Sequence, residues 1–221
     1  MSTFSSAESL LLISLDCDTS ATRTTHDISG DPQSDHNLLA RTCAGDEAAF
    51  AEIVARYRNP LTNYIHRLLN DYDTAIDLAQ ETFVRLYGAR DRYHTGYAFS
   101  TYIYRIATNL AISEMRKRRR RKLVSFASIF KSKEDHDARE FDPPDERPLA
   151  DSELIGREQQ QAVRRAIASL PANYRVPIVL RDIEELSYEE ISNMLAVSEG
   201  TIKSRISRAR GLLRQKLHGY L

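Results

Sequence analysis

The sequence is poor in the residue types from which enzyme and metal sites are built. Its two cysteines, Cys17 and Cys43, stand alone, so neither a structural zinc site nor a disulfide framework is predicted. Only 8 glycines are present, and they form neither a phosphate-binding loop nor a Gly-x-Ser-x-Gly elbow. The 6 histidines are scattered, without a carboxylate at the spacing of a metal site or a general base. We therefore expect no enzyme activity, no metal, no cofactor and no small-molecule substrate.

Long hydrophobic runs are also missing. The longest, residues 10–15, contains a serine and is far too short to span a bilayer. No basic leader precedes it, and Asp16 beside Cys17 is unsuited to a lipoprotein-type cleavage site. Since isolated cysteines also suit a reducing compartment, we expect a cytoplasmic protein.

The chain has no net charge, because 31 basic residues balance 31 acidic ones, yet the two signs are segregated. Residues 116–122 form an unbroken basic run, whereas residues 134–153 are dominated by carboxylates. Segregation of this kind can create a nucleic-acid-binding surface on a neutral protein.

Helical periodicity occupies two parts of the chain, residues 35–122 and 151–221. Residues 1–34 are rich in Ser, Thr and Asp and are expected to be a disordered N-terminal extension. Residues 123–150, with three prolines and clustered carboxylates, are expected to be a flexible linker. The predicted fold is therefore all-α, with two small helical domains joined by a flexible acidic linker.

In the first part we expect four helices. Pro60 either kinks the second helix or restarts it, and residues 70–71 end it. The third helix, residues 73–90, should direct Ile76, Ala79, Phe83 and Leu86 inward. The fourth begins at Phe99 and continues to residue 122. Its outward face is predicted to carry Thr101, Arg105, Thr108, Asn109 and Arg116.

Residues 186–217 have the pattern of a helix-turn-helix. Ser187 and Glu190 form a capping box for a first helix, and residues 196–197 break it. Ser198 can cap a second helix with Ile202 and Ile206 on its apolar face. The opposite face carries Lys203, Ser204, Arg205, Ser207, Arg208 and Arg210. This pattern is typical of DNA binding; the alternative is a helical hairpin whose basic face is merely solvated.

Two other surfaces are candidates for partners. The rings of Tyr93, His94 and Tyr97 lie near Arg105 and Asn109 and suit stacking on an unpaired base. The alternative is that such rings close the core, which we favour for Phe99 and Tyr102. The third helix has a polar, net-acidic face formed by Asp77, Gln80, Glu81 and Arg85. Because phosphates repel such a face, it is either plain surface or a protein-docking site.

The chain resembles the extracytoplasmic-function (ECF) sigma factors of bacterial RNA polymerase, which belong to the sigma-70 family. The resemblance rests on DLAQETFVRLY (77–87), FSTYIYRIATNLAISEMRKRRR (99–120) and LPANYRVPIVLRDIEELSYEEISNMLAVSEGTIKSRISRAR (170–210). It covers residues 38–122 and 152–217. It implies a sigma-2 domain over 35–122 and a sigma-4 domain over 151–221.

The resemblance also implies partners and site residues. The motif that docks on the clamp helices of the polymerase β′ subunit is matched by Asp77, Leu78, Gln80, Glu81 and Phe83. The part that melts the −10 element and captures a flipped base is matched by His94, Tyr97, Ser100, Arg105, Asn109, Arg116 and Lys117. The helix that enters the major groove at the −35 element is matched by Glu199, Thr201, Lys203, Ser204, Arg205 and Arg208. The implied partners are core polymerase, including its β flap, promoter DNA and an anti-sigma factor.

One departure from the family concerns Tyr102, which stands where the family commonly has tryptophan; this chain has no tryptophan. Two other classes of protein remain open at this point. The first is a two-domain helix-turn-helix regulator that binds an operator without polymerase, usually as a dimer on a palindrome. The second is an interaction protein with a decayed DNA-binding half, against which the intact Lys203, Arg205 and Arg208 face argues.

Overall fold

The computed structural model describes residues 34–93, 98–129 and 151–218. These residues form α-helices joined by short turns, without a β-strand among them, so the predicted all-α class is confirmed. None of the described helices combines the length and the apolar character that crossing a membrane requires.

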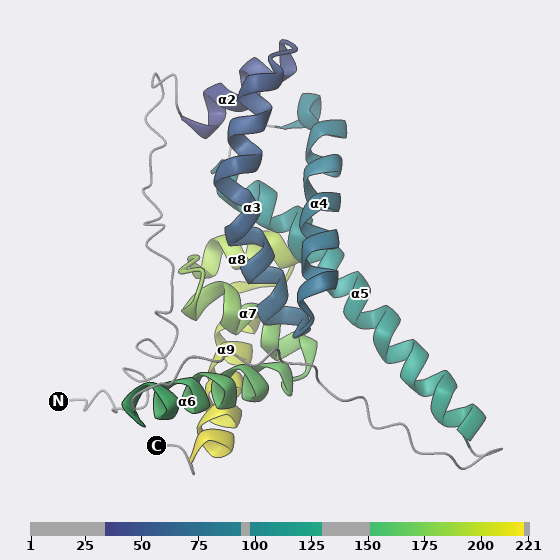
Figure 1. Cartoon of the computed structure of the whole chain (residues 1–221), viewed down its shortest axis with the longest axis vertical. Coiled ribbons are helices and arrows are strands. Elements are labelled where there is room, and N and C mark those ends of the chain that lie inside the picture. Colours follow the sequence, from purple (N-terminus) through teal and green to yellow (C-terminus); the bar gives the residue numbers. More distant parts are fainter. Residues whose placement is uncertain (1–33, 94–97, 130–150, 219–221) are drawn as a thin grey trace.

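The first four helices form an upright bundle (Figure 1). They are α2 (Asp35–Cys43), α3 (Glu47–Leu69), α4 (Tyr72–Gly88) and α5 (Phe99–Ile129), with a 3₁₀ turn, η1 (Arg90–Arg92), after α4. Helix α3 packs against α2, α4 and α5. The C-terminal half of α5 leaves the bundle and projects away from the other helices (Figure 1).

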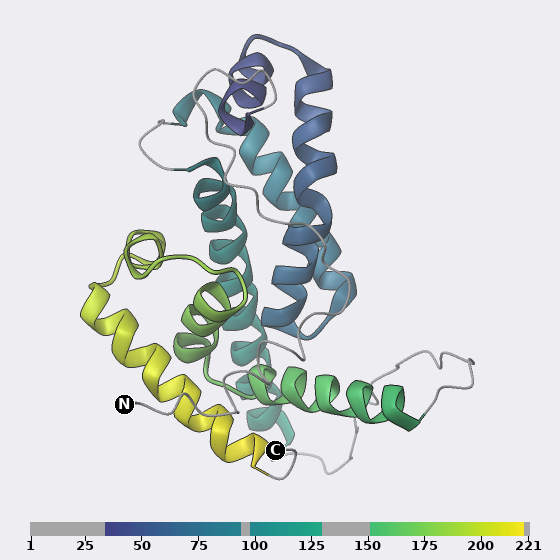
Figure 2. The same cartoon turned by 90° about the vertical axis from the view of Figure 1, so that its left-hand side faces the viewer.

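The last four helices form a smaller unit beside the lower half of this bundle. They are α6 (Asp151–Ala168), α7 (Ala172–Asp182), α8 (Tyr188–Leu195) and α9 (Glu199–Leu217). Helix α7 packs on α9 and also reaches α5, which places it between the two (Figure 2).

Side-chain caps define the starts of α3 and α4, and α4 begins at Tyr72 rather than at residue 73 as predicted. Asp46 accepts a hydrogen bond from the Ala49 amide at 3.1 Å, and Asp71 accepts one from the Thr74 amide at 3.0 Å. Asn70 has φ 52°, the left-handed conformation that ends α3. Pro60 does not restart the helix: α3 is continuous from Glu47 to Leu69.

Two segment boundaries in the structure differ from those predicted from the sequence. Ser34, which we assigned to the N-terminal extension, is buried and caps α2 by accepting a hydrogen bond from the Asn37 amide at 3.3 Å. Helix α5 continues past residue 122 to Ile129, so the start of the segment assigned to the linker is helical. Residues 1–33 and 130–150 lie outside the described part of the chain.

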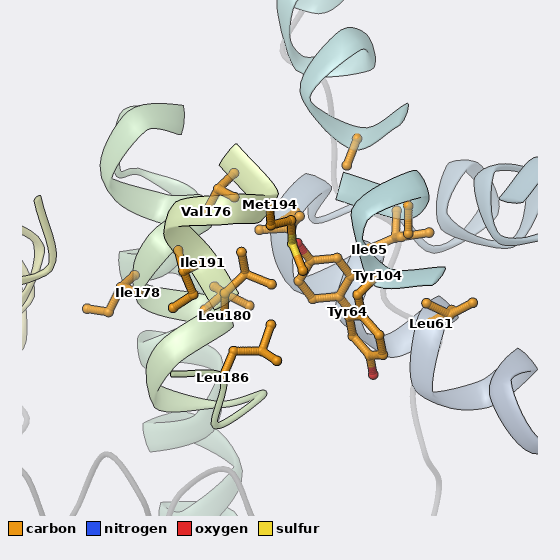
Figure 3. Close-up of a cluster of buried hydrophobic side chains, with 14 of the residues drawn as sticks. Leu61, Tyr64, Ile65, Tyr104, Val176, Ile178, Leu180, Leu186, Ile191 and Met194 are labelled. Carbon is orange, nitrogen blue, oxygen red and sulfur yellow. The ribbon is translucent and has the colours of Figure 1, made fainter. Parts of the chain in front are cut away.

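The buried side chains of both helical units form one contiguous core rather than two. Tyr64 and Ile65 of α3 face Leu180 and Met194 of the second unit (Figure 3). Thr101 and Thr108, which we expected on the outside of α5, are buried at 5% and 0% exposure. They are covered because α8 packs against this face of α5.

Candidate nucleic-acid interface

The helix-turn-helix predicted for residues 186–217 is present, with its complete capping box. The Ser187 hydroxyl accepts from the Glu190 amide at 3.1 Å, and the Glu190 carboxylate accepts from the Ser187 amide at 2.8 Å. Ala196 has φ 53° and ends α8. The turn is fixed by the Ser192 hydroxyl, which donates to the Val197 carbonyl at 2.6 Å. These local bonds hold the two helices in the arrangement typical of DNA-binding proteins.

Helix α9 presents a polar face because its apolar residues are all on the other side. Ser198 caps the helix by accepting from the Thr201 amide at 3.4 Å. Ile202, Ile206, Ala209 and Leu213 are buried. Of the predicted −35 residues, Glu199, Lys203, Ser204 and Arg208 are exposed, while Thr201 and Arg205 are partly buried.

Arg210 does not belong to this free basic face, although the sequence placed it there. Its guanidinium donates two hydrogen bonds to the carboxylate of Asp182, at 3.1 and 2.7 Å. Asp182 lies at the end of α7, so the pair fastens α9 to α7. We therefore assign Arg210 a structural role. Arg208 remains a candidate for DNA contact, because it is exposed on the same turn of α9.

Two aromatic–cation contacts at the start of the helix-turn-helix were not predicted from the sequence. The Tyr188 ring lies under the Arg181 guanidinium at 4.7 Å and under the Lys203 ammonium at 5.4 Å. The ring thus gathers two positive charges beside the exposed face of α9. No local pattern reveals this, because the three residues come from three different elements.

Four of the five described residues of the DNA face predicted for α5 are exposed. Arg105, Asn109, Arg116 and Lys117 are exposed, and Ser100 is partly buried. His94 and Tyr97 lie outside the described residues.

The aromatic residues that flank this loop close the core, as we expected for Phe99 and Tyr102. Phe99 is buried at 1% exposure. Tyr93 packs against Tyr102 with ring centroids 5.1 Å apart and against Phe99 at 6.0 Å. The Tyr93 hydroxyl is also hydrogen-bonded to Nδ1 of His36 at 2.9 Å. Tyr93 therefore anchors the start of the loop to α2 and is not a candidate for base stacking.

The basic run on α5 contains one arginine with a structural role. The Arg118 guanidinium donates to the carboxylate of Asp71 at 2.7 Å and to the Thr74 hydroxyl at 2.8 Å. It also donates to Glu114 at 3.2 Å. The hydrogen bonds from Thr74 and the charge of Arg118 hold the pKa of the Asp71 carboxyl below its usual range. Arg118 thus ties α5 to the first turn of α4, whereas Arg119 is exposed.

Alanine substitutions at Arg118 and Arg119 should therefore affect different properties: the first should lower stability, and the second should weaken DNA binding. Arg118→Ala should cost about 1 kcal/mol of stability and lower Tm by roughly 2–4 °C, because a partly exposed ion-pair network is lost. Arg119→Ala should leave Tm unchanged and reduce the slope of log affinity against log salt for DNA by about 0.9 if it contacts a phosphate. Thermal melts measure the change in Tm, and salt titrations measure the change in DNA affinity. Weaker DNA binding by Arg118→Ala with an unchanged Tm would contradict the structural role of Arg118.

The acidic face of α4 is exposed and contains an apolar patch. Asp77 and Gln80 are exposed, Leu78 is partly buried, and Glu81 binds Arg85 at 2.8 Å. Val84, at 67% exposure, lies on the same face and was not predicted as a site residue from the sequence. Phe83, which the resemblance implied as a polymerase contact, is only 7% exposed and belongs to the core. The face can therefore be formed by Asp77, Gln80, Glu81 and Val84, with Phe83 supporting it from beneath.

These features define a class of protein: a helical DNA-binding protein with a helix-turn-helix, a second basic helix and a separate exposed acidic face on α4. The family model described as Sigma-70 region 2 matches residues 53–121, and the one described as Sigma-70, region 4 matches residues 160–213. The chain is 33% identical to the ECF RNA polymerase sigma factor SigW of Bacillus subtilis, over 78% of this chain and 91% of that protein. It is 32% identical to the RNA polymerase sigma-H factor of Pseudomonas aeruginosa, over 86% of this chain and 96% of that protein.

A solved structure is similar as well. The sigma factor RpoE of Bartonella quintana, in its complex with the anti-sigma factor NepR, superposes with a TM-score of 0.58 at 26% identity. The match covers 76% of this chain and 96% of that chain. The chain belongs to the ECF sigma factors of the sigma-70 family.

Proposed function

We propose that this sigma factor binds core RNA polymerase and directs it to a specific set of promoters, without performing bond chemistry itself. The observation that carries the proposal is that two surfaces of opposite charge lie on different helices of the chain. An acidic docking face on α4 and a basic reading face on α9 are exposed together on one chain. Joining a polymerase contact to DNA contacts of modest strength gives specificity through effective concentration.

Each surface has a proposed role. Asp77, Gln80 and Glu81 dock on the β′ clamp helices, with Val84 adding an apolar contact. The exposed residues of α5, with His94 and Tyr97, bind the melted −10 element. The exposed residues of α9 read the −35 element in the major groove, where Arg and Ser side chains can hydrogen-bond base edges. The protein acts in the cytoplasm, where the polymerase and the promoter DNA are found.

An anti-sigma factor is a further proposed partner. The similar sigma factor of Bartonella quintana was solved in complex with one. Such a partner would restrain this chain by covering the surfaces that meet polymerase or DNA.

A binding experiment distinguishes this proposal from an operator-binding regulator. The purified chain is mixed with core polymerase and analysed by gel filtration, and its unassisted binding to genomic DNA fragments is measured at physiological salt. We expect co-elution with the polymerase and weak, non-specific DNA binding when the chain is alone. Tight binding of a palindromic fragment by a dimer, without co-elution, would overturn the proposal in favour of the regulator.

A further inference from the structure

Helix α2 lies outside the part of the chain that the region 2 family model matches, which begins at residue 53. It packs against α3 and η1, at the same end of the bundle as the start of α5 (Figure 2). Ser34, at 2% exposure, caps it by accepting a hydrogen bond from the Asn37 amide. The first turn of α2 is therefore fixed against the bundle at the place where α5 begins.

His36 in this first turn is bonded to the residue that precedes the −10 loop, the name we give to residues 94–97. The Tyr93 hydroxyl is 2.9 Å from Nδ1 of His36, and the two ring centroids are 5.5 Å apart. Both side chains are partly buried, so this hydrogen bond is stronger than it would be in open water. It joins two segments that are 57 residues apart in the sequence.

Asp35, the neighbour of His36, is connected to the other end of the −10 loop. Its carboxylate accepts hydrogen bonds from the Tyr57 hydroxyl and, at 2.7 Å, from the Arg56 guanidinium. The Tyr57 ring packs edge-on against Phe99, the first residue of α5, with centroids 5.4 Å apart. Tyr93 packs against the same Phe99 ring. One aromatic cluster, held by the first turn of α2, thus fixes the residues on both sides of the loop.

Fixed ends matter for a loop that binds a ligand. Binding is weakened by the cost of ordering a loop, and this cost is smaller when the supporting residues already hold the loop near its bound conformation. The observed affinity falls in proportion to the fraction of molecules in the competent conformation. A residue that holds one end of a loop can therefore strengthen binding without touching the ligand.

We propose that His36 is a positioning residue for the capture of the −10 base and that it acts through Tyr93. The inference rests on the proposed function, since it concerns the −10 contact of the same chain. It extends that contact to α2, which was not predicted as part of any site. No local pattern indicates this role, because the partners of Asp35 and His36 are 22 and 57 residues away.

Four variants separate this hydrogen bond from the general stability of α2. His36→Phe retains a ring against Tyr93 and loses the bond, and Tyr93→Phe removes the same bond from the other side. His36→Asn is the conservative variant, because its amide has a polar atom on Cγ, where Nδ1 stands in histidine. Arg41→Ala is the matched control, since it removes an exposed ion pair with Asp46 at the other end of α2. Circular dichroism verifies that each variant retains its helices.

The affinities are measured on the complex with core polymerase, using two labelled probes from a promoter mapped by run-off transcription. The first probe is a fork whose −10 non-template strand is single-stranded, and the second is a duplex with the −35 element alone. We expect His36→Phe and Tyr93→Phe each to bind the fork about 3- to 10-fold more weakly, the effect of one lost hydrogen bond. The double variant should be no weaker than either single one, because both remove the same bond. His36→Asn and Arg41→Ala should bind the fork like the wild type, and every variant should bind the −35 duplex equally.

Removing single bases from the fork gives a readout that a purely structural role would not change. In the wild type, an abasic site at the captured position should weaken binding more than one at any other −10 position. In His36→Phe the same abasic site should weaken binding by a smaller factor, because the capture of that base is already impaired. The two factors should differ by about 3- to 10-fold, as the fork affinities do.

The inference is overturned if His36→Phe binds the fork as tightly as the wild type, or if Arg41→Ala weakens fork binding equally. It is also overturned if the abasic site has the same effect in His36→Phe as in the wild type. In each of these cases, base-dependent fork binding by the wild type would leave the proposed function intact. A wild-type complex that is insensitive to base removal at every −10 position would instead remove the proposed −10 contact, and the inference with it.

Discussion

Arg208→Ala is expected to lower promoter-specific transcription by about 5- to 150-fold, equivalent to the roughly 1–3 kcal/mol of a lost base contact. Arg208 is exposed on the polar face of α9, and no ion pair holds it within the described part of the chain. Its guanidinium is therefore available to a base edge or phosphate in the major groove. Transcription at saturating polymerase measures the effect, and the thermal stability of the variant should equal that of the wild type.

Arg210→Ala is the matched control, since it removes the same charge two residues further along α9. Because Arg210 is bound to Asp182, its loss should cost about 1 kcal/mol of stability and a few degrees of Tm. Its effect on transcription at a permissive temperature should be small. If Arg210→Ala impaired promoter recognition as strongly as Arg208→Ala, the division between the reading face and the structural face of α9 would be wrong.

Asp77→Arg is expected to weaken binding to core polymerase by at least tenfold, while DNA binding by the free chain is kept. Asp77 is exposed on α4 beside Gln80. Reversing a charge inside a complementary interface costs several kcal/mol when like charges are brought together. Competition for core polymerase against a labelled wild-type chain gives the affinity directly.

Glu52→Arg makes the same charge change on the neighbouring helix α3. Glu52 is an exposed residue that pairs with Arg56 on the same helix, at 3.1 Å, so replacing this ion pair by a like-charge pair should cost no more than about 1 kcal/mol of stability. Its affinity for core polymerase should match the wild type. Equal affinities for Asp77→Arg and the wild type would remove the α4 face from the docking site.

Local signals were sufficient to predict most of the secondary structure. The Ser187–Glu190 capping box and the break at Asn70 depend on residues within four positions of one another. The apolar spacing on α9 correctly placed Ile202 and Ile206 in the core. Such features are visible because a helix interacts with itself at intervals of three and four residues.

Long-range packing could not be predicted in the same way. Thr108 is a polar residue at an outward position of α5 and is buried because Met194, 86 residues later, covers it. Arg118 and Arg210 look like any other cation of a basic face, and only Asp71 and Asp182 show that they are structural. The sequence therefore identifies where the basic surfaces are, whereas the structure decides which of their charges are available to DNA.

Run-off transcription on genomic DNA fragments with purified core polymerase tests the central claim most directly. With 5′ ends mapped in the presence and absence of the chain, we predict discrete new transcripts that depend on it. Their upstream regions should share two sequence elements at a constant spacing, because α5 and α9 must engage DNA at the same time. A set of transcripts that is unchanged by the chain would contradict its assignment as an initiation factor.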